Sequence, residues 1–221
     1  MPAKANPQKQ REFFETVLRP LMKQAKDGKI TLLFTDAAHF VMGCDFLGYI
    51  YGKFRRFVKT FSGRVRYNVL GALDFCSNRV VTVTNDTYIT ALQVCELLAK
   101  IAADYTGRAI YVVLDNAKYQ KCAAVIEKAA ELGIRLVFIP PYSPNLNLVE
   151  RLWRFVKARL RTRFYNDFGR FCATIDGLVA STVSANKTIV EKLISEKVQL
   201  FDDLVAVNEN TFQMGSQSRI I

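Results

Sequence analysis

The chain has 221 residues, of which 50% are hydrophobic and 23% are charged, so its composition excludes wholesale disorder, collagen and a coiled-coil fibre. No run of about eighteen apolar residues occurs, so no membrane span is predicted, and residues 1–6 lack the apolar stretch of a signal peptide. Lys and Arg number 31 against 20 Asp and Glu, which gives a net charge of +11. A domain this basic usually meets a polyanion; the alternative is an ordinary basic protein without such a partner.

Apolar spacing predicts first a helix over residues 7–27, which Pro20 should kink or divide. A buried strand over 30–35 follows and ends at Asp36. The later elements are strands over 65–75 and 79–84 joined by a hairpin turn at 76–78, a helix over 88–104, a strand over 109–114 that ends at Asp115, a helix over 118–132, a strand over 134–139, a stiff loop over 140–144 and a helix over 147–162.

The order of these elements predicts an α/β fold. Early antiparallel strands followed by alternating strands and helices imply a mixed five-stranded sheet flanked by helices. Residues 166–200 predict two more helices, and 201–221 predict a poorly packed tail. The expected organisation is a helical segment over 1–28, a catalytic domain over 29–165 and C-terminal helices with a tail over 166–221.

Cysteine and histidine exclude several kinds of site. The five cysteines are scattered and form no C-x-x-C pair, so they are predicted to be reduced residues of a cytoplasmic protein. A single histidine, His39, argues against a His-rich zinc site and against a Ser-His-Asp triad. No nucleotide cofactor is predicted, because neither a P-loop nor a G-x-G-x-x-G motif occurs. Carboxylates are the remaining candidates for chemistry.

Three carboxylates stand at the edges of predicted elements. Asp36 and Asp115 each follow an apolar strand, where ligand and catalytic groups often emerge, although such an aspartate can also start a turn or cap a helix. Glu150 lies three residues after Asn147, which is also the spacing of a capping box. Carboxylates are the ligands that Mg²⁺ prefers, and two such ions can promote phosphodiester cleavage without a histidine.

Two basic stretches flank these carboxylates. Glu150 leads a stripe on one helical face that continues through Arg154, Lys157 and Arg161, and six basic residues but no acid occur over 151–163. The other stretch contains Lys53, Arg55, Arg56, Lys59, Arg64 and Arg66. Both could be solvated surface or an edge strand that deters aggregation. Contact with phosphates is the preferred interpretation, because both stretches carry a single sign of charge beside the carboxylates.

Three blocks contain these carboxylates: residues 35–40 (TDAAHF), 113–120 (VLDNAKYQ) and 140–153 (PPYSPNLNLVERLW). They resemble the catalytic blocks of DDE transposases, in particular the bacterial insertion-sequence branch of the mariner superfamily. The last block is the most specific because it is long, and the 34 residues between Asp115 and Glu150 are a separation typical of that branch. The resemblance covers roughly residues 7–165.

The resemblance implies an RNase H-like fold, two Mg²⁺ or Mn²⁺ ions held by Asp36, Asp115 and Glu150, and cut-and-paste transfer of double-stranded DNA. Family members nick the transposon end by hydrolysis, and the freed 3′-hydroxyl attacks target DNA, commonly at a TA step. Residues that would shape the site without binding metal are Asn116, Tyr142, Ser143 and Asn147. His39 would either contact DNA or support the site, or pack in a structural role. A homodimer in the DNA complex is expected by analogy, since transposition joins two ends.

One difference from the family concerns the N-terminal region. Family members usually carry a helix-turn-helix region that reads the inverted repeats, whereas this chain begins just before the catalytic part. We therefore expect one reading frame of a two-frame transposase, a truncation or a decayed copy, in the bacterial cytoplasm near the nucleoid. Two other functions stay open: a catalytically silent DNA-binding or dimerising remnant, and a ribonuclease H or junction-resolving nuclease, against which the long Pro-Tyr-Ser-Pro block argues.

Overall fold

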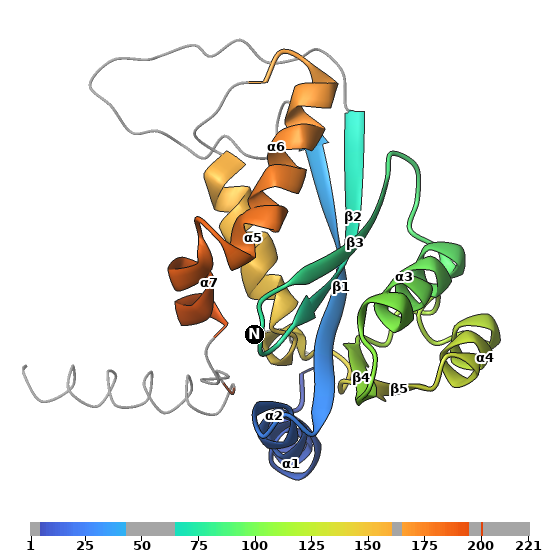
Figure 1. The fold of residues 1–221 in the computed structure, drawn as a ribbon. Helices are drawn as coiled ribbons and strands as arrows, with labels where there is room; N and C mark the ends of the chain where they lie inside the picture. Colours follow the sequence, from blue (N-terminus) through green and yellow to red (C-terminus); the bar gives the residue numbers. More distant parts are fainter. Residues whose placement is uncertain (1–4, 43–64, 161–164, 195–199, 201–221) are drawn as a thin grey trace, which may run out of the picture.

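A computed structural model of the chain describes residues 5–42, 65–160, 165–194 and 200 (Figure 1). Its centre is a five-stranded sheet in the order β3-β2-β1-β4-β5. The strands are β1 (Ile30–Met42), β2 (Val65–Asp74), β3 (Val80–Asn85), β4 (Ala109–Leu114) and β5 (Ile134–Phe138). β2 runs antiparallel to β1 and β3, whereas β1, β4 and β5 run parallel. The predicted mixed five-stranded sheet is confirmed.

Helices cover both faces of this sheet. They are α1 (Pro7–Phe13), η1 (Phe14–Leu18), α2 (Arg19–Lys26), α3 (Ala91–Asp104), α4 (Ala123–Glu131), η2 (Pro144–Leu146), α5 (Val149–Leu160), α6 (Phe168–Ala180), η3 (Ser181–Val183) and α7 (Lys187–Leu193). Figure 1 shows α3 and α4 on one side of the sheet and α5, α6 and α7 on the other, with α1 and α2 beside the start of β1. Within the described ranges, no helix has the length and apolar character needed to span a bilayer.

Pro20 divides the N-terminal helix, as predicted. Between α1 and α2 the chain forms one turn of π-helix, in which the Arg19 N–H donates to the carbonyl of Phe14. Proline has no N–H to continue the α-helical ladder, and its ring crowds the preceding turn. A wider turn at that point accommodates the interruption.

β1 is longer than predicted, and the expectation that the strand ends at Asp36 is wrong. β1 pairs with β4 only from Ile30 to Phe34, but its antiparallel pairing with β2 continues to Met42. The ladder with β2 therefore satisfies the backbone groups beyond Phe34, and the strand continues. Asp36 lies inside a strand, just past the point where the parallel pairing stops.

The other boundaries are close to those predicted, with one exception. The helix expected over 118–132 is shorter and begins at Ala123, because the chain turns sharply after β4. The Asp115 carboxylate accepts a hydrogen bond from the Ala117 N–H at 2.9 Å, which favours this turn over a helix. The expected helix end near Thr162 and the tail over 201–221 lie outside the described residues.

The sheet separates two hydrophobic clusters. One contains α5, α6 and the even-numbered residues of β1, such as Phe34 and Phe40. The other contains α3, α4 and odd-numbered residues of β1, such as Leu33. Because side chains alternate along a strand, Asp36 emerges on the α5 face and His39 on the opposite face.

Candidate active site

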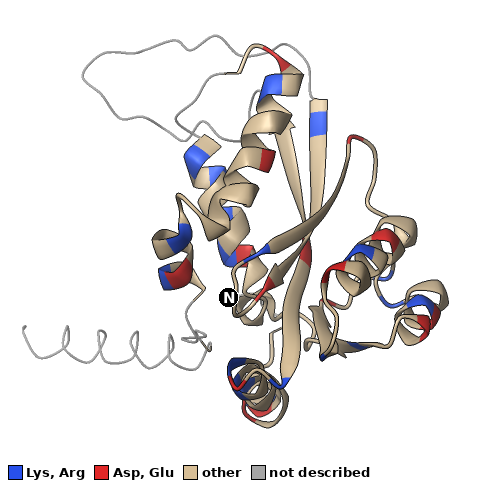
Figure 2. Ribbon diagram, viewed as in Figure 1, with Lys and Arg blue, Asp and Glu red and all other residues tan. Residues whose placement is uncertain are grey.

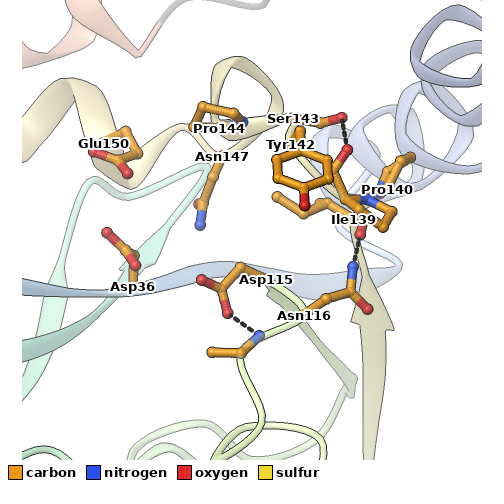
Figure 3. Close-up of a pocket in the computed structure, with 12 residues that line it drawn as sticks. Asp36, Asp115, Asn116, Ile139, Pro140, Tyr142, Ser143, Pro144, Asn147 and Glu150 are labelled. Atoms are coloured by element: carbon orange, nitrogen blue, oxygen red, sulfur yellow. Dashed lines mark hydrogen bonds between the residues drawn. The ribbon is translucent and has the colours of Figure 1, made fainter. Parts of the chain in front are cut away.

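Three carboxylates line a single cavity of about 520 Å³. Asp36 comes from β1, Asp115 follows the last residue of β4, and Glu150 lies in the first turn of α5. Figure 3 shows the side chains of Asp36 and Glu150 pointing toward each other across the cavity, with Asp115 beside them. Because β1 and β4 are adjacent and parallel, both aspartates lie just past the carboxyl end of their parallel pairing, which stops at Phe34 and Val113.

Asn147 ties the start of α5 to the strand that carries Asp36. Its side-chain amide donates to the Thr35 carbonyl at 3.0 Å, in a buried bond between residues far apart in the sequence. The capping-box interpretation of Asn147 and Glu150 is wrong, because the Glu150 N–H donates to the backbone carbonyl of Asn147 and not to its side chain. The Asn147 Oδ1 atom is buried and has no hydrogen-bond partner within the described part of the chain.

Gly71, which the sequence analysis did not identify, sets how closely α5 approaches the sheet. Gly71 is paired directly with Asp36 across β1 and β2, so both residues belong to the same face. The Trp153 ring lies over Gly71, and a Cβ there would stand 2.7 Å from its Cη2 atom. Phe40 packs edge-on to the same ring at 6.3 Å between centroids. A glycine inside a predicted strand is a recognised sign of close packing, and this signal was available in the sequence.

The Asp36 carboxyl is held in its neutral form. Burial raises its pKa to about 8, and the nearby charges of Glu150 and Asp115 add to the rise. The Ala37 N–H and the Lys157 ammonium act in the opposite direction but do not offset it. In the absence of a cation, the carboxyl of Asp36 is therefore mostly protonated at neutral pH.

These residues fit a divalent cation by their chemistry. Carboxylate oxygens are the donors that Mg²⁺ and Mn²⁺ prefer, and the positive charge of a cation would act against both the burial and the repulsion that keep Asp36 protonated. Across the residues that the structure describes, no three His, Cys, Asp or Glu side chains are already gathered around one point.

The loop over 140–147 forms one wall of the cavity. Asn116 donates its amide to the Ile139 carbonyl, which joins the ends of β4 and β5. Ser143 is buried and donates to the Pro141 carbonyl at 3.2 Å, whereas Tyr142, which also lines the cavity, is 52% exposed as a residue. Tyr142 has φ +59°, a left-handed conformation that non-glycine residues rarely adopt.

The basic residues that were predicted to contact DNA differ in where they lie relative to the cavity and in whether the structure describes them. Figure 2 shows Lys and Arg along α5, where Arg154 is exposed. Lys157 is half-buried, lies 5.9 Å from the centroid of the Phe40 ring and acts electrostatically on Asp36. Arg66 is exposed on β2. The predicted DNA contacts that lie outside the described residues are Lys53, Arg55, Arg56, Lys59, Arg64 and Arg161.

His39 belongs to a polar network on the face of the sheet opposite the carboxylates. Its Nδ1 atom lies 2.6 Å from the Asn68 Oδ1 atom. The Asn68 amide donates to Asn85 and to the Thr87 carbonyl, so its oxygen is the acceptor and His39 Nδ1 carries the proton. His39 thus supports the sheet from the side away from Asp36.

Solved structures with a similar fold are complexes of the Mos1 mariner transposase. The paired-end complex with Mn is 14% identical, with 94% of this chain and 64% of that chain covered and a TM-score of 0.61. The paired-end complex with the left transposon end is 12% identical, with 90% and 66% covered and a TM-score of 0.59. The strand transfer complex is 14% identical, with 90% and 64% covered and a TM-score of 0.53. At these identities the likeness shows the fold, and the predicted RNase H-like fold is confirmed.

The chain spans less than two thirds of the length of these Mos1 chains. No curated protein sequence matches it. The family model for DDE superfamily endonuclease matches residues 45–172, more than half of the chain, and this match includes Asp115 and Glu150. The chain therefore belongs to the DDE superfamily endonucleases.

Proposed function

We propose that this chain is the catalytic domain of a DDE transposase that cuts double-stranded DNA at the ends of an element and transfers the freed strand to a target. The observation that carries the proposal is the convergence of Asp36, Asp115 and Glu150 on one cavity. These carboxylates come from two parallel strands and a helix that are distant in the sequence. Membership of the DDE endonuclease family supports the same chemistry.

In this proposal Asp36, Asp115 and Glu150 hold two Mg²⁺ or Mn²⁺ ions. Such ions promote attack by water or a hydroxyl on the phosphorus and stabilise the leaving oxygen. Water first breaks a phosphodiester bond and leaves a 3′-hydroxyl on the element. That hydroxyl then attacks the phosphorus of a phosphodiester in the target DNA. A phosphodiester forms between the element's 3′ oxygen and the target phosphorus, the target's own P–O3′ bond breaks, and a target strand with a 3′-hydroxyl is the leaving group.

The remaining residues of the cavity prepare the carboxylates for this task. Asn147 keeps the first turn of α5 against β1, so Glu150 stays opposite Asp36. Lys157 favours the ionised form of Asp36, which has to lose its proton before it can bind a cation. Asn116, Tyr142 and Ser143 shape the cavity wall without serving as metal ligands.

The partners follow from the proposed reaction. Double-stranded DNA is the substrate, and the candidate phosphate contacts are the basic residues over 53–66 together with Arg154, Lys157 and Arg161. We expect two copies of the chain to act together, because two ends have to be joined. The bacterial insertion-sequence branch and a cytoplasmic site of action remain predictions from the motif blocks and the cysteine pattern.

A nicking assay tests the proposal. Supercoiled plasmid DNA is incubated with the full chain and Mg²⁺ or Mn²⁺, with EDTA as the metal-free arm. We expect nicking with either metal, none with EDTA, and a loss of at least about 100-fold in Asp115→Asn, as expected when a group needed in the transition state is removed. The matched control is Asp86→Asn, because Asp86 is exposed and lies outside the cavity.

Two results would count against this function. Equal nicking by Asp115→Asn and the unaltered chain would remove Asp115 from the site. Salt-sensitive DNA binding without metal-dependent nicking would favour the silent remnant. Offering an RNA–DNA hybrid and branched DNA in the same assay tests the nuclease alternative, which requires faster cleavage of one of these substrates than of duplex DNA.

A further inference from the structure

The N-terminal helix reaches the wall of the active site through one buried polar side chain. Gln10 of α1 is 0% exposed. Its amide nitrogen donates to the Tyr142 carbonyl at 3.4 Å, and its amide oxygen accepts from the Asn145 side chain at 3.1 Å. Both ends of the amide thus bind the loop over 140–147, which lies more than a hundred residues later in the chain. This helix lies outside the part of the chain that the family model matches.

The loop needs such support because its backbone is strained. Tyr142 has φ +59°, which costs energy for a residue with a side chain and persists only where the surroundings hold it. The carbonyl of this strained residue is the group that Gln10 binds. A hydrogen bond from a fully buried side chain is well placed to hold it, since breaking that bond would leave the N–H group of the Gln10 amide buried and without this acceptor, while the amide oxygen still accepts from Asn145.

The strained conformation presents an aromatic ring to the cavity. Tyr142 lines the cavity together with Asp36, Asp115 and Glu150, and about half of the residue is exposed. In Figure 3 the ring stands on the loop between Ser143 and Ile139, on the Asp115 side of the cavity. An exposed aromatic face beside a site for DNA cleavage offers a surface on which a base can stack.

We infer that Gln10 is a positioning residue of the active site: it holds Tyr142 so that its ring stacks on a base next to the bond that is cut. This inference rests on the proposed DNA cleavage. It makes α1 part of the catalytic machinery, so a movement of α1 changes the site without touching the carboxylates. The chemical class recognised is an unpaired or distorted nucleotide at the cleaved end, because a base within intact duplex is not free to stack on a side chain.

The first test measures the loop itself and does not depend on activity. Gln10→Met keeps the size of the side chain but removes both hydrogen bonds, and Gln10→Glu keeps only the acceptor for Asn145. Gln8→Met is the matched control, since Gln8 is an exposed glutamine on the same helix. We expect amide hydrogen exchange over 140–147 to rise several-fold in Gln10→Met, to rise less in Gln10→Glu and to stay unchanged in Gln8→Met. Unchanged exchange over 140–147, or an equal rise throughout the sheet, would overturn the inference.

The second test asks whether Gln10 acts through Tyr142. Single-turnover cleavage is measured at saturating DNA, together with DNA affinity, for Gln10→Met, Tyr142→Ala and the double variant. We expect roughly tenfold slower cleavage in Gln10→Met with nearly unchanged affinity, because a small misplacement of a positioning group costs rate. The same change should have no further effect in the Tyr142→Ala background.

A 2-aminopurine base at the cleaved end supplies an independent signal. Its fluorescence should be quenched by the unaltered chain and recover in Gln10→Met and in Tyr142→Ala. Fully additive losses of rate, or equal quenching in all variants, would show that Gln10 does not work through Tyr142. If the unaltered chain cleaves no DNA, the proposed function fails, and so does the part of the inference that concerns DNA. In that case hydrogen exchange still decides whether Gln10 holds the loop.

Discussion

Replacing Gly71 with alanine is expected to move Glu150 away from Asp36 without altering any polar group. The new methyl carbon would stand 2.7 Å from Cη2 and 2.8 Å from Cζ2 of Trp153. Carbon atoms in good contact are about 3.5–4.0 Å apart, so the ring has to move by about 1 Å. Trp153 is almost fully buried and lies one helical turn after Glu150. A displaced ring therefore moves the start of α5.

The size of the effect follows from this displacement. Forcing extra volume into a packed core typically costs about 1–3 kcal/mol. The general gain from replacing glycine in a strand, about 0.5–1 kcal/mol, offsets part of that cost. We therefore expect Gly71→Ala to lose about 1 kcal/mol of stability, within a net range of about 0–2.5 kcal/mol, and a carboxylate misplaced by about 1 Å to slow cleavage by up to about 100-fold.

The assay combines thermal unfolding with metal-dependent nicking. Gly177→Ala is the control, because a Cβ at Gly177 of α6 meets open space and alanine favours a helix. The double variant Gly71→Ala with Trp153→Phe tests the cause. Phenylalanine lacks the ring atoms that the methyl group meets, so the smaller ring should restore part of the lost stability and rate.

Two outcomes would refute this reasoning. One is a Gly71→Ala protein that unfolds at the original temperature and nicks DNA at the original rate. The other is strict additivity in the double variant, since residues in direct contact should show a coupling energy of about 0.5–3 kcal/mol. Either result would mean that the Trp153 ring does not set the position of α5.

The remaining predictions concern charge and packing around the site. The pKa of Asp36 is about 8 in the native metal-free protein, and an unfolded aspartate titrates near pH 4. Between these two values the native protein binds one proton more than the unfolded chain, so the free energy of unfolding falls as the pH rises from about 4 to about 8. Asp36→Asn should remove this fall and raise the melting temperature in EDTA at about pH 8. If the melting temperatures of the two proteins instead change with pH in parallel, the pKa of Asp36 is not raised. Lys157→Met should move the pH–rate profile of nicking to higher pH, because the charge that lowers the pKa of Asp36 is gone; a change in DNA affinity alone would identify Lys157 as a phosphate contact. Tyr67→Phe removes the hydrogen bonds from the Tyr67 hydroxyl to both carboxylate oxygens of Asp176, each 2.9 Å long, and should cost about 1–2 kcal/mol in a denaturant titration with little change in nicking. An unchanged unfolding midpoint would show that this link between β2 and α6 contributes no stability.

Much of the fold could be predicted from local signals in the sequence. Apolar runs of strand length located β4, which follows Gly107, and the hairpin of β2 and β3, which turns at residues 76–78; Pro20 marked the interruption of the N-terminal helix. The order of strands and helices then indicated the mixed sheet. These signals can be recognised in a sequence because each depends on residues that are near one another in the chain.

Properties that arise from pairs of distant segments were missed. The continuation of β1 past Asp36 depends on β2, which supplies hydrogen bonds after β4 has ended. With the strand ended too early, the alternation that places His39 on the opposite face could not be applied. The spacing of Asn147 and Glu150 matched a capping box, but the Asn147 side chain instead binds the carbonyl of Thr35.

By itself, the sequence determined the chemistry available: three carboxylates in motif blocks, a basic chain, and strands and helices in an order that builds an α/β sheet. Only the tertiary structure decided how these groups act on one another. The pKa of Asp36, the approach of Trp153 to Gly71 and the hold of Gln10 on the loop over 140–147 each depend on distances between atoms that the chain brings together from far apart. Electrostatic repulsion, packing and hydrogen bonding act over a few ångströms of space, and a linear pattern does not record those separations.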